Sequence, residues 1–287
     1  MNAVSLPRPQ SLDPPEPYDG MPVSEADYWE FYYLGPEVTY EWNNGILEEK
    51  GVSDYLTFQV FDWFIQLLIE YLRTNPIANR VGLEMGFRLR LPNKVAIRRP
   101  DYGLVLHDNP APLEGPVQSY RGIFDICIEG VSTSTKAMQQ RDTVVKKVEY
   151  AAGGVREYYL LHHSPKLRNF YRLNERGVYE PMPIEPGHIV SSEVLPGFRW
   201  RLDDLERKPP LETLMTDPVY QDFVRVNYQR ELAKAAQAET KAAQAETKAA
   251  QAETKAAQES ARAEQERNRA ERLAERLRAL GIAPEEC

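Results

Sequence analysis

The sequence has few cysteines and histidines, and their placement argues against several kinds of site. Cys127 lies inside an apolar run and Cys287 is the last residue, so there is no disulfide framework and no CxxC spacing for zinc. The histidines are His107, His162, His163 and His188. They form no HExxH motif and no His/Cys cluster, which argues against a structural zinc site. We expect Cys127 to be a small core residue.

Long apolar runs and an excess of positive charge are also missing. No stretch of about 18 apolar residues occurs, so we expect no membrane span and no membrane partner. Residues 1–21 are proline-rich and polar and lack the apolar core of a secretory signal, which predicts a disordered lead-in and a cytoplasmic protein. The net charge of −8 excludes a basic coat over the whole surface, although a local basic groove remains compatible with it.

The chain is long and apolar enough for a packed core. It has 287 residues, of which 42% are hydrophobic and 27% charged, so one ordinary domain with an extension, or two small domains, is expected. Mixed helix and strand signals fill residues 22–205, residues 206–230 resemble a connector, and residues 231–283 form a low-complexity tail rich in Ala, Glu, Lys, Gln and Arg.

The tail contains an exact seven-residue repeat, KAAQAET, that begins at Lys234, Lys241 and Lys248. Seven is the period of a coiled coil, so residues 231–283 predict a homo-oligomer joined through this segment. Alanines along the contact face of such a helix bury little apolar area, and burial contributes only about 25 cal/mol per Å². Most of the stabilisation of an oligomer would therefore come from Leu273, Leu277 and Leu280. A single solvated helix is the alternative, and the pattern does not decide between the two.

The body alternates helix and strand patterns. Val38–Leu47 predicts two strands around an Asn-Asn-Gly turn, and Asp54–Leu72 has a helical period with Ser53 as a candidate N-cap. Further strands are expected over Val81–Leu91, Ala96–Leu106, Phe124–Val131, Val155–His162 and Leu167–Leu173, with a helix over Thr135–Ala152 that Gly153-Gly154 ends. This order predicts an α/β domain in layers. In such a strand, His162 and His163 point to opposite faces and make a poor ligand pair.

Two acidic residues stand among apolar neighbours. Glu129 lies inside the apolar run FDICIEGV, where a carboxylate is costly unless it is paired or binds a cation. Asp101 follows a proline and precedes the apolar segment YGLVL. Adjacent strands could bring the two carboxylates together, and two hard oxygen donors are the minimum for Mg²⁺ or Mn²⁺. The plainer alternative for Asp101 is a turn or strand-start residue.

Basic residues near this pair supply the remaining candidates. Position 131, which shares the strand face of Glu129, is a valine, so the nearest candidate cation is Lys146, with Asp142 four residues earlier as its orienting group. Lys146 and Asp142 could equally form an ordinary surface ion pair. Arg98 and Arg99 precede Asp101 and are candidate phosphate contacts or ordinary surface charges.

These motifs together resemble the Uma-type family of restriction endonucleases, within the restriction-endonuclease-like PD-(D/E)xK superfamily. The resemblance covers residues 22–205. It rests on VTYEWNNGILEE, Pro100-Asp101, Glu129 with Ser132, Asp142, Lys146, Tyr150, Gly154-Val155, Glu157-Tyr158 and SSEVLPGF. The chain departs from the pattern at Val131, where the superfamily has a lysine, and at SDYLTFQ, where the family often has a histidine.

The resemblance implies a mixed central sheet flanked by helices, followed here by the helical coiled-coil tail. It also implies a Mg²⁺- or Mn²⁺-dependent endonuclease that hydrolyses DNA phosphodiester bonds. Asp101 and Glu129 would hold the metal, Lys146 would act on the attacking water, and Glu41 would be an additional acid if it is not a surface strand residue. The alternative is a catalytically degenerate nuclease fold that serves as an oligomeric binding or scaffold module, which Val131 and the acidic net charge favour.

Overall fold

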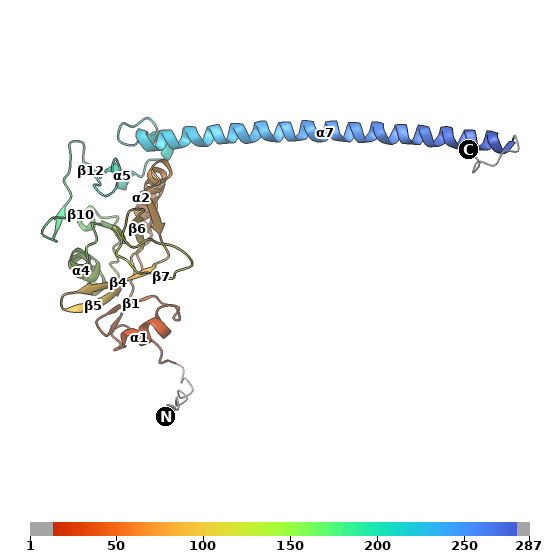
Figure 1. Cartoon of the computed structure of the whole chain (residues 1–287). Coiled ribbons are helices and arrows are strands. Elements are labelled where there is room, and N and C mark those ends of the chain that lie inside the picture. The colour runs from red at the N-terminus through yellow and green to blue at the C-terminus, as the bar shows by residue number, and fades with distance from the viewer. Residues whose placement is uncertain (1–13, 280–287) are drawn as a thin grey trace, which may run out of the picture. The chain divides into compact units, whose positions relative to one another are not determined.

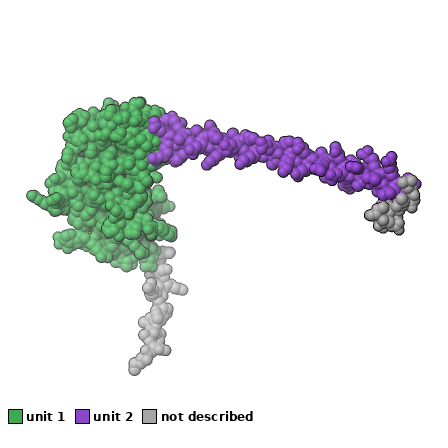
Figure 2. All heavy atoms as spheres, turned by 45° about the horizontal axis from the view of Figure 1, so that its top comes forward, with its two compact units in different colours: residues 1–227 green, residues 228–287 purple. Residues whose placement is uncertain are grey.

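The computed structural model describes residues 14–279, and the chain divides into two compact units, residues 1–227 and 228–287 (Figure 2). The first unit holds the sheets (Figure 1). Most of the lead-in expected over residues 1–21 lies outside the described residues. Within residues 14–279, no helix is both long and apolar enough to cross a bilayer.

Two mixed sheets form the centre of the first unit. The five-stranded sheet has the order β2-β1-β5-β4-β7 and the six-stranded sheet the order β11-β10-β9-β8-β6-β3. The first contains β1 (Tyr40–Asn43), β2 (Ile46–Glu49), β4 (Gly86–Leu91), β5 (Lys94–Arg98) and β7 (Ser119–Tyr120). The second contains β3 (Ala78–Val81), β6 (Tyr102–Leu106), β8 (Ile126–Gly130), β9 (Glu157–Leu161), β10 (Asn169–Leu173) and β11 (Tyr179–Pro181). A separate pair joins β12 (Ile189–Ser191) to β13 (Arg199–Arg201).

The helical elements are mostly short, apart from α2 and α7. They are α1 (Glu25–Asp27), the π-helical turn η1 (Tyr28–Tyr32), α2 (Tyr55–Thr74), α3 (Lys136–Gln140), the π-helical turn η2 (Arg141–Val145), α4 (Lys146–Gly153), the 3₁₀ turn η3 (Pro165–Leu167), α5 (Asp204–Arg207), α6 (Leu211–Leu214) and α7 (Gln221–Ala279). The α/β class expected from the sequence is therefore confirmed, with two mixed sheets and a long C-terminal helix.

The central strands β8 and β9 of the six-stranded sheet are buried on both faces. Along β8, Ile126 and Ile128 pack into the core that contains α2, whereas Cys127 and Val131 pack into the core that contains Tyr150 of α4. This alternation explains the nearly unbroken apolar sequence of β8, because a strand covered on both sides has no wet face. Glu129 lies on the Cys127 face and is buried.

Two of the expected long strands are each divided between the sheets. Leu83 and Glu84 have positive φ angles of 55° and 53°, and the turn they form separates β3 from β4. The segment from Arg99 to Asp101 separates β5 from β6 in the same way. Periodicity alone did not reveal these breaks, since the apolar pattern continues on each side of the point where the chain changes sheet.

The N-cap of α2 is one residue later than expected. Asp54, not Ser53, accepts hydrogen bonds from the backbone N–H groups of Leu56 (2.9 Å) and Thr57 (3.0 Å). Ser53 instead donates through its hydroxyl to the Gly130 carbonyl at 2.7 Å. The start of α2 is thereby tied to the end of β8.

The expected connector is largely part of the first unit. Within residues 206–227, Leu214, Val219, Tyr220, Phe223 and Val224 are buried in the core that contains α2. The single helix α7 begins at Gln221 and continues through the second unit, where nearly all described side chains are exposed. The helical prediction for the tail is confirmed, whereas the coiled coil stays a prediction. Leu280, which is expected to stabilise such an oligomer, lies outside the described residues.

Candidate active site

The site lies where the chain passes from one sheet to the other. Asp101 directly precedes β6, which pairs antiparallel with β8, and Tyr102 is the register partner of Ile128. The backbone N–H of Gly130 donates to Asp101 Oδ2 at 2.7 Å. Asp101 is therefore fixed beside the residue that follows Glu129, and the structure brings the two expected carboxylates together.

Glu129 has two differently engaged oxygens. Its side chain is only 2% exposed. Oε1 accepts hydrogen bonds from Lys146 Nζ and from the Tyr150 hydroxyl, both at 3.0 Å. Oε2 faces Lys50 Nζ at 3.9 Å. The ring of Tyr150 lies in the core, and its hydroxyl is part of the site.

Lys146 is bound by three carboxylates rather than facing an open cavity. Its Nζ lies 3.0 Å from Glu129, 3.1 Å from Asp142 and 3.2 Å from Glu41, and its side chain is 1% exposed. Asp142 belongs to the π-helical turn η2, and Lys146 begins α4. Single π turns inside helices are frequent at functional sites. Glu41 is also fully buried, so it is not the surface strand residue that the sequence left as an alternative.

Lys50 is the residue that the sequence analysis missed. It directly follows β2 and its ammonium group contacts Asp101 Oδ1, in addition to facing Glu129 Oε2. Glu84 Oε1 lies 3.5 Å from the same Nζ. A cavity of about 10 Å³ lies here, lined by Lys50, Gly51, Asp101, Glu129, Gly130, Met138, Arg141, Asp142 and Lys146. This volume is close to that of one water-sized sphere.

The buried acids differ in their ionisation. Burial raises the pKa of Glu129 to about 8, although Lys146 and Lys50 act in the opposite direction. Burial also works to raise the pKa of Glu41, but Lys146, Arg98 and Lys50 outweigh it and lower that pKa to about 2. The carboxylates increase the pKa of Lys50 and Lys146, so both lysines carry a charge at neutral pH.

The stability of the protein is expected to depend on pH through Glu129. The unfolded carboxyl loses its proton near pH 4.5, whereas the folded one keeps it to about pH 8. Between these values the native state binds more protons, so this group makes the free energy of unfolding fall as pH rises. His162, whose pKa burial lowers, acts in the opposite direction below pH 6.5.

Urea titrations from pH 5 to 9 should therefore compare wild type with Glu129→Gln. The variant should lack the decrease between about pH 5 and 8, and parallel curves would contradict the assignment.

Arg98 and Arg99 do not face a site for phosphate. Arg98 is fully buried and donates to Glu41 (3.1 Å), Glu48 and Glu149. The guanidinium of Arg99 donates to the carbonyls of Glu84 (2.9 Å) and Tyr33 (2.5 Å). As placed, neither guanidinium can meet a phosphate group without breaking these bonds. Sequence reasoning could not show this, because adjacent arginines in a polar segment are usually exposed.

A different basic surface lies on the five-stranded sheet. A hollow of about 620 Å³ is lined by Trp29, Arg88, Arg90, Ser119, Tyr120, Arg121, Gly122, Ile123, Ala152 and Gly153. Arg88 is paired with Glu25, whereas Arg90 and Arg121 are exposed. An aromatic ring beside exposed guanidinium groups is the composition expected of a nucleic-acid contact surface.

The two adjacent histidines lie together, contrary to expectation. β9 ends at Leu161, so the alternation of a strand does not apply to them, and their ring centroids are 4.2 Å apart. With Asp54 they bring three possible ligand atoms within 4.8 Å of one another. However, His162 Nδ1 accepts a hydrogen bond from the backbone N–H of Ser164 at 2.9 Å, which places the ring proton on Nε2, toward Asp54. A proton on that nitrogen opposes a metal ion, so we assign none here.

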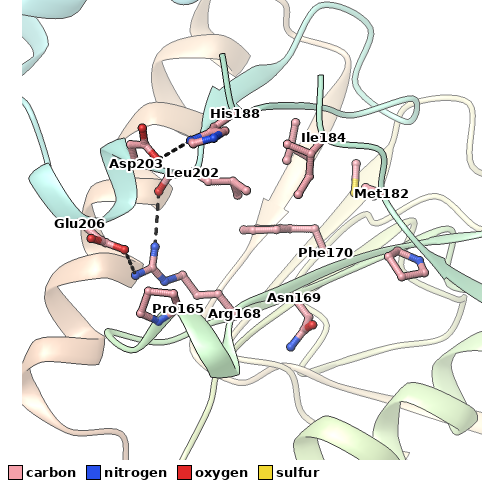
Figure 3. Close-up of a pocket in the computed structure, with 12 residues that line it drawn as sticks. Pro165, Arg168, Asn169, Phe170, Met182, Ile184, His188, Leu202, Asp203 and Glu206 are labelled. Carbon is pink, nitrogen blue, oxygen red and sulfur yellow. Dashed lines mark hydrogen bonds and ion pairs between the residues drawn. The ribbon is translucent and has the colours of Figure 1, made fainter. Parts of the chain in front are cut away.

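An apolar hollow of about 380 Å³ lies beside β10 and α5 (Figure 3). Arg168 extends along its wall and pairs with Glu206 at 3.1 Å, while His188 pairs with Asp203 at 2.9 Å. The charged side chains of the hollow are thus paired with one another. None of the residues that line it belongs to the expected site.

The comparisons with known proteins give the family of the chain and agree with its fold. Residues 25–204 match the family model of Uma2, described as "Putative restriction endonuclease", and the chain belongs to this family. A solved structure, that of a putative nuclease belonging to DUF820 from Anabaena variabilis ATCC 29413, is similar with a TM-score of 0.52 and 14% identity. The similarity covers 65% of this chain and 99% of that one, and at this identity it shows a shared fold. No curated protein matches the chain.

Proposed function

We propose that the protein is a metal-dependent endonuclease that hydrolyses phosphodiester bonds in DNA. The observation that carries the proposal is that Asp101 and Glu129 converge on a single cation, the ammonium group of Lys50, inside the Uma2 domain. Family membership supports DNA as the substrate. The aromatic and arginine-lined hollow beside Arg90 and Arg121 is a candidate surface for the DNA backbone.

The residues present fit a divalent metal ion. Asp101 Oδ1 and Glu129 Oε2 are carboxylate oxygens that face the same point, and hard oxygen donors of this kind are the ligands of Mg²⁺ and Mn²⁺. The ammonium group of Lys50 already lies at that point, which supports an electrostatic environment that favours a cation. We assign Asp101 and Glu129 as the residues that would hold the metal.

The surrounding residues would prepare this acid pair for hydrolysis. A divalent ion bound there would lower the pKa of a water molecule and neutralise charge on the phosphate. Gly130 N–H orients Asp101, while Lys146 and Tyr150 hold Glu129 by its other oxygen. Because Lys146 is enclosed by carboxylates, we assign it as a positioning residue that holds Glu129 and opposes the rise of its pKa on burial, rather than one that touches the attacking water. In the reaction the water oxygen bonds to phosphorus, one bridging P–O bond breaks, and the departing oxygen gains a proton.

The test is incubation of the purified protein with supercoiled and linear DNA in Mg²⁺, Mn²⁺ or EDTA. Cleavage that requires the metal supports the proposal, and its absence with all substrates and metals removes it. One specific observation favours the alternative of a catalytically degenerate module, namely that Lys50 and Lys146 already compensate the acid pair. In that case added Mg²⁺ should leave the melting temperature unchanged, because an ion that does not bind the native state cannot stabilise it.

We further propose that residues 231–283 join copies of the chain through a coiled coil. The repeat gives a seven-residue period along α7, and Leu273 remains 52% exposed in the single chain. Ending the chain after Arg230 should then reduce the mass measured by sedimentation from that of an oligomer to that of one subunit. The core residues of α7 up to Asn227 remain in this truncated chain. A full-length protein that sediments as one subunit would contradict the coiled coil.

A further inference from the structure

In each carboxylate of the pair Asp101 and Glu129, one oxygen is held by hydrogen bonds and the other faces the side chain of Lys50. Asp101 Oδ2 is bound by the Gly130 N–H, and Glu129 Oε1 by Lys146 and Tyr150. The other oxygen of each carboxylate faces Lys50 Nζ. The position that a metal ion would take between these oxygens is therefore held by the ammonium group of this lysine.

The two lysines of the site differ in their freedom to move. Lys146 projects from the first residue of α4 into a ring of three acids and is 1% exposed. Lys50 is 8% exposed and follows the end of β2, and its third neighbour, Glu84, has a side chain that is 35% exposed. Glu84 thus offers a carboxylate at the solvent-facing edge of the site, toward which the ammonium group of Lys50 can turn.

The backbone beside Lys50 is held in place, so the movement involves the side chain. A Cβ atom added at Gly51 would lie 2.5 Å from Ser132 Oγ, and the hydroxyl of Ser132 donates to the Val52 carbonyl at 3.1 Å. A lysine has four rotatable bonds and a strongly hydrated ammonium group, which suits it to exchange between partners more than an arginine.

We propose that Lys50 is an internal competitor for the metal position, and that a divalent ion binds to Asp101 and Glu129 only by displacing its ammonium group toward Glu84 and solvent. Without metal, the charge of Lys50 would then neutralise the acid pair. A metal ion would bind only at concentrations high enough to displace the ammonium group. The inference rests on the proposed metal site. It adds a residue that matches no part of the family motif found in the sequence.

The first test measures how fast each lysine of the wild-type protein is acetylated by acetic anhydride, with the labelled peptides identified by mass spectrometry. Without metal, Lys50 and Lys146 should both be protected. With saturating Mn²⁺, Lys50 should become labelled at a rate at least several-fold higher, while Lys146 stays protected. The exposed Lys166 serves as the internal standard for reagent activity. Mn²⁺ that binds through Asp101, as shown by loss of binding in Asp101→Asn, without any change at Lys50 would overturn the proposal.

The second test measures Mn²⁺ binding by electron paramagnetic resonance. Lys50→Met should bind Mn²⁺ about 10- to 100-fold more tightly than wild type, the usual range of coupling between two binding events. Lys166→Met removes the same charge away from the site and should leave the affinity unchanged. Adding Asp101→Asn to Lys50→Met should abolish the gain. An affinity of Lys50→Met equal to or weaker than wild type, in a folded protein, would overturn the proposal.

The outcomes separate this inference from the proposed function. Tighter binding in Lys50→Met with no DNA cleavage by either protein supports the competition and removes the nuclease. Metal-dependent cleavage by wild type, with no gain of affinity in Lys50→Met, supports the nuclease and overturns the competition. If neither protein binds Mn²⁺, the competition is overturned together with the metal site.

Discussion

Asp101→Asn and Glu129→Gln are each expected to lower metal-dependent DNA cleavage by about 100-fold or more. Each change keeps the size of the side chain and removes one anionic oxygen ligand. A preorganised electrostatic group aimed at developing charge typically contributes about 10²–10³ in rate. Asp101 Oδ1 and Glu129 Oε2 both face the metal position, so neither residue can replace the other. Initial cleavage rates at saturating Mg²⁺ measure the effect.

The control is Asp108→Asn, the same chemical change at an exposed residue beyond β6. It should cleave at the wild-type rate. Melting temperatures must accompany the rates, because Glu129→Gln alters a partner of Lys146 and Tyr150. Cleavage by either acid variant within a few-fold of wild type would show that the nuclease activity resides elsewhere or in a contaminant.

Sequence reasoning located the acid pair because both residues conflict with their surroundings. A carboxylate in FDICIEGV needs a physical explanation, and the order of the strands suggested that Asp101 would supply part of it. Lys146 and Asp142 followed from helical spacing, and the structure places them at 3.1 Å. Local pattern was sufficient here because β6 and β8 are adjacent and each residue lies at or beside a strand end.

The rest of the site depends on contacts between the sheets, which carry no local signal. Lys50 follows two glutamates at the end of a hairpin, so nothing in its neighbourhood distinguishes it from a surface lysine. Its role becomes visible only when the end of β2 is placed against Asp101. The direction of the two histidine rings was also not predicted, because β9 ends at Leu161 and the alternation of a strand does not extend to His162 and His163.

Replacing Arg98 with methionine is expected to lower the free energy of unfolding by about 3–5 kcal/mol. Removing one partner of a buried ion pair leaves the other charge without compensation. Here three carboxylates, of Glu41, Glu48 and Glu149, lose their shared guanidinium. That loss is a large part of the 5–15 kcal/mol typical of a domain, and urea unfolding at pH 7 measures it.

The comparison with Arg88→Met separates burial from mere loss of charge. Arg88 lies on the neighbouring strand β4 and pairs with Glu25, but its side chain is 32% exposed, so we expect a loss of about 1 kcal/mol or less. Arg98→Lys should be intermediate, because one ammonium group cannot bind as many carboxylate oxygens as a guanidinium. The deficit of Arg98→Met should shrink at pH 5, where the glutamates that have lost the guanidinium group can take up protons. If Arg98→Met costs no more than Arg88→Met, the buried arginine is not what holds β1, β2 and α4 together beside the acid pair.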